Sequence, residues 1–151
     1  MKHYLLLALA ALTFFTLAHA DDNGLITKKS AHPPKETIDR LESLLTTKGI
    51  TVALRWSHSD RASGVGIDVR PTELIIFGNP KLGSHMFTSN QTAGIDFPMK
   101  VLAWEDADGQ TWVTYNDPSY LAERHGIEDR TEIVQKMSGA LQRVTDAAAA
   151  P

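Results

Sequence analysis

Hydrophobic residues recur along this chain with two spacings, one typical of helices and one typical of strands. Leucine and isoleucine residues between the pair Pro33-Pro34 and Gly49 recur at helical spacing, so we expect a helix there. A second apolar stripe near the end of the chain predicts a last helix, with Asp129 and Glu132 as its capping box. After that helix we expect a flexible tail at residues 147–151.

Five segments have the patterns of strands. Residues 51–58 alternate between apolar and polar side chains, as a half-buried strand does. Residues 73–77 are continuously apolar, which is typical of a strand covered on both faces. Residues 100–105 and 111–115 flank an Asp-Gly turn signal and predict an antiparallel hairpin, and residues 24–29 are a weaker first strand.

Shorter signals complete the predicted order of elements. Asn79 is the expected cap of a helix that runs to about Ser89, and Asp117 caps a second short helix that ends near His125. Residues 59–66 are expected to form a loop or a broken turn of helix. Because the strands are grouped between helices, the sequence predicts an α+β domain with a largely antiparallel sheet covered by helices on one side.

The first part of the chain, residues 1–20, has the features of a secretory signal peptide. A short basic start precedes the apolar residues 4–17, and residues 18–20 fit the small-x-small rule for cleavage before Asp21. The apolar run of about 14 residues is shorter than the ~20 that a membrane-spanning helix needs. We therefore expect one mature domain at residues 21–146, periplasmic or secreted and free of the membrane.

Composition argues against several classes of function. The chain has 15 Lys and Arg residues against 18 Asp and Glu residues, and no run rich in Lys or Arg, so we expect no nucleic-acid partner. It has no cysteine, which excludes disulfides, thiolate chemistry and Cys-type zinc or iron–sulfur sites.

Four short motifs carry a resemblance to a known family. They are the NPK tripeptide after an apolar strand, residues 93–98, the sequence VLAWED at residues 101–106, and residues 116–121. With these motifs the chain resembles the family called domain of unknown function 302. The resemblance implies a fold of strand, helix, four strands and helix, similar to the TATA-box-binding-protein-like fold, and often a homodimer. It implies no reaction, and a thiol role is in doubt because this chain has Gly78 where many relatives have Cys.

The strongest candidate for a ligand site is the point where the apolar strand ends and the next helix begins. Free N–H groups at a helix start carry partial positive charge and Lys81 adds a full one, which favours a small anion or a carboxylate. Asn79 would orient the loop, and His85 lies on the same helix face as Lys81. A second group of residues follows the strand at residues 111–115: Asn116, Asp117 and Tyr120. This group would form one cleft with the first if that strand runs in the same direction as the strand at residues 73–77. A plain helix cap with a solvated lysine is the alternative interpretation.

Two other functions stay open. Imidazole and thioether groups in an exported protein raise the possibility of a copper-type site. The residues concerned are His58, His85, His125, Met86 and Met99. No two of them stand at a typical metal-ligand spacing, so we assign no metal ligand and no cofactor. No local catalytic motif is present, and an enzyme would need an active site assembled from distant residues, for example around Asn79, Lys81 and His85.

Overall fold

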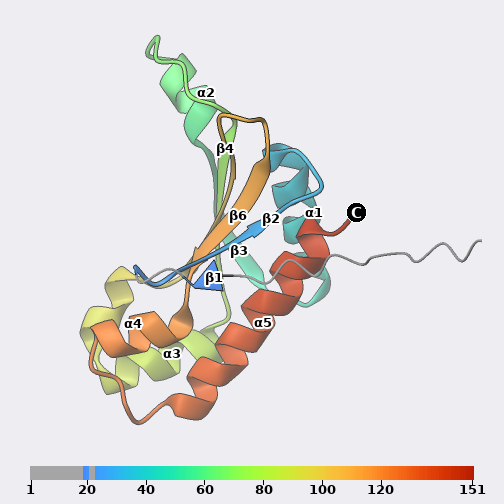
Figure 1. The fold of residues 1–151 in the computed structure, drawn as a ribbon. Coiled ribbons are helices and arrows are strands. Elements are labelled where there is room, and N and C mark those ends of the chain that lie inside the picture. Colours follow the sequence, from blue (N-terminus) through green and yellow to red (C-terminus); the bar gives the residue numbers. More distant parts are fainter. Residues whose placement is uncertain (1–18, 21–22) are drawn as a thin grey trace, which may run out of the picture.

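The computed structural model describes residues 19–20 and 23–151 and contains a six-stranded antiparallel sheet in the order β1-β2-β6-β5-β4-β3 (Figure 1). The strands are β1 (His19–Ala20), β2 (Leu25–Lys29), β3 (Thr51–Ser57), β4 (Thr72–Gly78), β5 (Met99–Glu105) and β6 (Thr111–Asn116). The helices are α1 (Pro34–Thr47), α2 (His58–Ser63), α3 (Pro80–Ser89), the 3-10 helix η1 (Gln91–Ile95), α4 (Pro118–Arg124) and α5 (Thr131–Ala149). The α+β class and the principal order of strand, helix, four strands and helix are confirmed. Apart from β1, the predicted signal peptide lies outside the described residues.

Two long helices cover one face of the sheet, as the apolar stripes predict. In Figure 1, α1 and α5 lie on the same side of the strands. Ile38 and Leu41 of α1 are at most 1% exposed, and so are Ile75 of β4 and Val113 of β6, which face the helices. The core of the protein therefore lies between these helices and the sheet.

The opposite face of the sheet has no helix across it in the described residues. Since side chains alternate along a strand, this face carries the residues between the buried ones. We call it the open face, and its large apolar residues are Leu25, Leu54, Trp56, Leu74, Ile76, Leu102, Trp104 and Trp112. The rings of Trp104 and Trp112 stack across the hairpin with centroids 6.4 Å apart. The prediction that residues 73–77 are covered on both faces is corrected, because helices cover only one.

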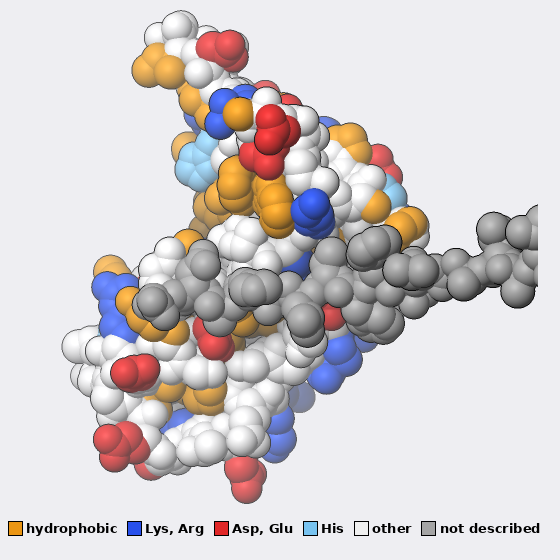
Figure 2. Space-filling view, viewed as in Figure 1, with side chains coloured by type: hydrophobic (Ala, Val, Ile, Leu, Met, Phe, Trp, Pro, Cys, Tyr) orange, Lys and Arg blue, Asp and Glu red, His pale blue; other side chains and the backbone are white. Residues whose placement is uncertain are grey.

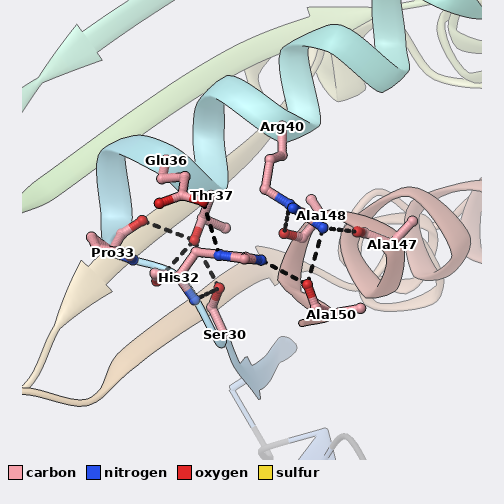
Figure 3. A network of polar contacts seen from close by, with 9 residues as sticks. All are labelled: Ser30, His32, Pro33, Glu36, Thr37, Arg40, Ala147, Ala148 and Ala150. Atoms are coloured by element: carbon pink, nitrogen blue, oxygen red, sulfur yellow. Dashed lines mark hydrogen bonds and ion pairs between the residues drawn. The ribbon is translucent and has the colours of Figure 1, made fainter.

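The predicted flexible tail is also corrected, because α5 continues to Ala149 and its end is held in place (Figure 3). The backbone N–H of Ala31 donates to the carbonyl of Ala149 at 2.9 Å. Nε of Arg40 donates to the carbonyl of Ala148 at 3.1 Å, and Ala148 and Ala149 are buried. The carbonyl groups at the end of this helix therefore have partners, which a free helix end lacks.

Two local predictions need correction as well. The N-cap of α5 is Arg130 and has no side-chain cap, since the carboxylate of Asp129 instead accepts a hydrogen bond from Ser89 at 2.6 Å. Residues 59–66 contain much of a true helix, α2, whose first turn is capped by the hydroxyl of Ser57. This helix extends beyond the sheet (Figure 1).

Candidate functional site

A cavity of about 510 Å³ lies where β4 ends and α3 begins. Its walls come from the end of α1, the start of β3, α3, α5 and the segment from η1 to β5. Of its 20 lining residues, only Thr51, Asn79 and Ser84 have polar side chains. The cavity is therefore lined almost entirely by apolar groups and carries no charged residue in its wall.

The apolar patterns of separate segments converge to make this lining. Phe77 is the last inward-facing residue of β4, and Leu141 belongs to the buried stripe of α5. Two glycines, Gly78 and Gly83, contribute backbone but no side chain to the wall. A Cβ atom added at Gly83 would meet no atom within 4 Å, and one at Gly78 would lie 3.2 Å from Cβ of Pro98. We expect a large side chain at Gly83, where there is open space, to reduce the volume of the cavity.

Asn79 caps α3 as predicted, and in doing so it uses the N–H groups that were expected to bind an anion. Its side-chain oxygen accepts from the N–H of Lys81 at 3.0 Å. Its backbone oxygen accepts from the N–H groups of Leu82 and Gly83, both at 2.9 Å. Pro80 has no N–H. The helix start therefore offers an anion its partial charge and the nearby lysine, but not these donors.

Lys81 and His85 lie on α3 with exposed side chains, and neither lines the cavity. The backbone carbonyl of His85 accepts a hydrogen bond from Nε of Arg130 at 3.1 Å, which joins α3 to the start of α5. Of the six residues predicted to bind a ligand, Asn79 alone contributes to the wall of the cavity.

The second predicted group is at the same end of the strands but not in this cavity: Asn116, Asp117 and Tyr120. Because β4 and β6 are both antiparallel to β5, they run in the same direction, so the stated condition for convergence is met. However, β5 separates them, and two strand spacings amount to about 10 Å. The Asp117 carboxylate caps α4 by accepting from the N–H of Ser119 at 2.9 Å. These three residues belong to the junction of β2, β6 and α4.

The residues considered for a copper-type site are spread over the molecule. Met86 is 0% exposed and Met99 is 6% exposed, and both are part of the hydrophobic core. His58 and His85 are exposed on α2 and α3. In residues 23–151, where side chains are described, no group of three or more His, Asp or Glu residues is placed to hold a metal ion.

A polar cluster between η1 and the end of α4 was not predicted from the sequence. Nε2 of His125 lies 2.7 Å from Oδ2 of Asp96, and Nδ1 lies 2.9 Å from Oγ1 of Thr92. The His125 side chain is only 7% exposed. Asp96 and Thr92 are 29 and 33 residues away along the chain, so no local spacing identifies the cluster. The one available signal is that Asp96 lies within the motif at residues 93–98.

No helix in the described part of the chain has the length and apolar character needed to cross a membrane.

A family model and a solved structure both connect this chain with the same family. The model of the family described as domain of unknown function DUF302 matches residues 26–144. A crystal structure of an uncharacterised conserved DUF302 protein from Bacillus stearothermophilus aligns with a TM-score of 0.74 and 22% identity, over 83% of this chain and 98% of that one. That similarity shows the fold.

Among curated proteins, the chain is similar to a fluoride-specific ion channel, FluC 1, of Brucella suis biovar 1 (strain 1330), with 40% identity over 120 residues. FluC 1 of Brucella abortus biovar 1 (strain 9-941) gives the same identity. The matched part is 80% of this chain but only 47% and 44% of those proteins, so the chain spans less than half of their length.

Proposed function

This chain belongs to the DUF302 family, and on that premise we propose that it binds a small, mainly apolar molecule with an anionic group in the cavity at the start of α3. The observation that carries the proposal is the lining, in which 17 of 20 residues have no polar side chain. A volume of about 510 Å³ lies within the range of roughly 300–1,000 Å³ that ligand pockets have. Burial of apolar ligand surface there supplies about 25 cal/mol per Å².

The anionic group of the ligand is proposed to lie near Lys81, at the mouth of the cavity. Lys81 stands between Pro80 and Leu82, which both line the cavity, and its side chain is exposed. The positive end of the α3 dipole adds a weaker attraction for negative charge. His85, one turn further along α3, is proposed as a second donor.

Titration with 1-anilinonaphthalene-8-sulfonate, which combines aromatic rings with one sulfonate, tests both parts of the proposal. Gly83→Phe places a ring at a lining position where an added Cβ meets no atom, and we expect it to weaken binding at least tenfold. Gly83→Ala is the matched control and should keep most of the affinity. Lys81→Ala should weaken binding about two- to fivefold, and more at low salt, because an exposed charge is screened.

Unchanged binding in Gly83→Phe, with a normal unfolding transition, would place the dye elsewhere and refute the cavity. Unchanged binding in Lys81→Ala at low salt would refute the anionic part alone. A series of alkyl carboxylates that displace the dye then defines the preferred ligand length.

The open face supports the further proposal that the protein is a homodimer. Its large apolar residues, among them Leu74 and Leu102, have no covering layer of helices in the described residues. Beyond α2, Val65 and Ile67 are 74% and 58% exposed, and Figure 2 shows hydrophobic side chains at this tip. Large apolar residues without a covering layer are typical of interaction sites. In sedimentation experiments Leu102→Glu should give a monomer, whereas Gln135→Glu on the exposed side of α5 should not.

Export remains a proposal that rests on the sequence of residues 1–20. Cleavage after Ala20 would remove β1 and leave β2 as the edge strand of the sheet. Mass spectrometry of the protein from a periplasmic extract should find Asp21 as its first residue. Recovery of the full-length chain from the cytoplasmic fraction would contradict export.

The similarity to fluoride channels favours a second candidate function. Because the matching region is less than half of proteins named as fluoride-specific ion channels, we propose that this chain serves as an accessory domain in fluoride handling. Deletion of its gene should increase growth inhibition by sodium fluoride, and expression of the chain should restore growth. Equal inhibition of deletion and parent strains would rule this function out.

A further inference from the structure

A hydroxyl, an imidazole and a carboxylate are joined by successive hydrogen bonds between η1 and the end of α4. Oγ1 of Thr92 is 2.9 Å from Nδ1 of His125, whose Nε2 is 2.7 Å from Oδ2 of Asp96. The imidazole is 7% exposed and the Asp96 side chain 13% exposed, whereas Thr92 is exposed. The carboxylate of Asp96 and the imidazole of His125 are therefore shielded from solvent, whereas the hydroxyl of Thr92 is accessible.

The partners of the two ring nitrogens determine the direction in which a proton can move. A carboxylate only accepts hydrogen bonds, so Nε2 of His125 carries the hydrogen that faces Asp96. In the neutral ring Nδ1 then has the free lone pair, and this lone pair faces the Thr92 hydroxyl. His125 is thus oriented as a base toward Thr92, which is the arrangement that activates a hydroxyl nucleophile.

The side chains of Asn90 and Arg124 also contact this cluster. The Asn90 side chain donates from Nδ2 to the carbonyl of His125 at 2.8 Å, which fixes the end of α4 against η1. Oγ1 of Thr92 also donates to Oδ1 of Asn90 at 2.9 Å, so Asn90 is a second acceptor for the same proton. Nη1 of Arg124 lies 3.7 Å from Oδ1 of Asp96 and places a cation beside the cluster.

From this geometry we propose that Thr92, His125 and Asp96 form a nucleophilic site that takes acyl groups from small esters. Oγ1 of Thr92 attacks the ester carbonyl carbon and its proton passes to Nδ1 of His125. The bond to the leaving oxygen breaks, and that oxygen takes the proton from His125. Water, deprotonated by Nδ1 of His125, then attacks the acyl carbon. The bond to Oγ1 of Thr92 breaks, the proton passes from His125 to Oγ1, and the acid is released. Asp96 acts through His125 as a positioning residue.

Acetylation by p-nitrophenyl acetate tests the site, with release of p-nitrophenol and mapping of the acetyl group by mass spectrometry as readouts. We expect a burst of p-nitrophenol and an acetyl group on Thr92. Thr92→Val should abolish both, and Thr92→Ser should retain them. Thr88→Val removes another exposed hydroxyl, on α3, and should leave the burst unchanged.

The positioning role of Asp96 has its own test. Asp96→Asn should slow acetylation of Thr92 about 100-fold or more, the lower limit of general base catalysis, while Asp96→Glu should recover part of the rate. A purely structural role would reduce stability in both variants without this difference in rate. Acetylation of Thr92 no faster than that of Thr88, or an unchanged burst in Thr92→Val, would overturn the proposal. Dye binding in the cavity is measured separately, so the two proposals fail independently.

Discussion

The ring of Tyr120 lies directly over Gly24, so that a Cβ atom added at position 24 would be 2.1 Å from Cγ of Tyr120. Gly24 has a φ of +78°, a backbone conformation that other residues rarely adopt. Beside this contact, the N–H of Asp117 donates to the carbonyl of Gly24 at 2.8 Å. Tyr120 thus fixes the start of β2 against the start of α4, a packing role that its predicted place in a ligand site did not include.

Replacement of Gly24 should therefore be costly for two reasons that can be separated. Gly24→Ala adds both backbone strain and the clash with the ring, and we expect a loss of about 2 kcal/mol or more in urea unfolding. In the double variant with Tyr120→Ala the clash is gone and only the strain remains. The sum of the stability losses of the two single variants should therefore exceed the stability loss of the double variant. A sum equal to the loss of the double variant would contradict the contact.

The end of α5 should contribute measurably to stability. Truncation after Asp146 removes the bond between Ala31 and Ala149, the carbonyl partners of Arg40 and two buried alanines. We expect a loss of about 2 kcal/mol in thermal or urea unfolding. Removal of Pro151 alone is the control and should have almost no effect. An unchanged midpoint in the longer truncation would mean that these contacts do not persist in solution.

The hairpin turn should make the protein sensitive to acid. The indole N–H of Trp112 donates to the Asp106 carboxylate at 2.7 Å and, with backbone N–H groups of Gln110 and Asp108, holds the pKa of Asp106 below its ordinary value. The stabilisation is fully present above pH ~4 and is lost as the pH falls through the lowered pKa. The indole N–H resonance of Trp112 should shift in that range.

Asp106→Asn is the matching variant, because it keeps the shape of the turn and replaces one carboxylate oxygen by a donor. The Trp112 resonance should then show no acid transition, and the stability of the variant should vary less between pH 5 and pH 3. A transition of the same size in both proteins would show that another group is responsible.

Local signals predicted the elements well where a single short motif determines a boundary. Asn79 before Pro80 located the start of α3, and the Asp-Gly turn located the β5–β6 hairpin. What these signals could not give were contacts between distant segments. The cap at Asn79 is itself the reason that the predicted anion site lacks free donors, which depends on atomic geometry.

The cavity and the cluster at His125 escaped prediction for the same physical reason. The apolar lining combines residues from α1, β3, β4, α3, η1 and α5 that each look like ordinary core residues in the sequence. The sequence marks His125 only as the end of a short helix and as a possible metal ligand, whereas folding brings it to Asp96. Only the arrangement of the strands and helices in space reveals either feature.

An ion pair between the buried Lys28 of β2 and the exposed Asp146 of α5 gives the last prediction. Lys28 faces the helices and its side chain is 6% exposed, and its ammonium group bonds the carboxylate of Asp146. The ring of Tyr115 lies 5.6 Å from the same nitrogen. Asp146→Ala leaves a charge buried without its partner, and we expect a loss of about 2 kcal/mol. Lys28→Met removes the charge itself and retains apolar contact with Tyr115, so it should cost less than Asp146→Ala in urea unfolding. The reverse order would mean that solvent reaches the lysine and that the pair contributes no more than a surface salt bridge.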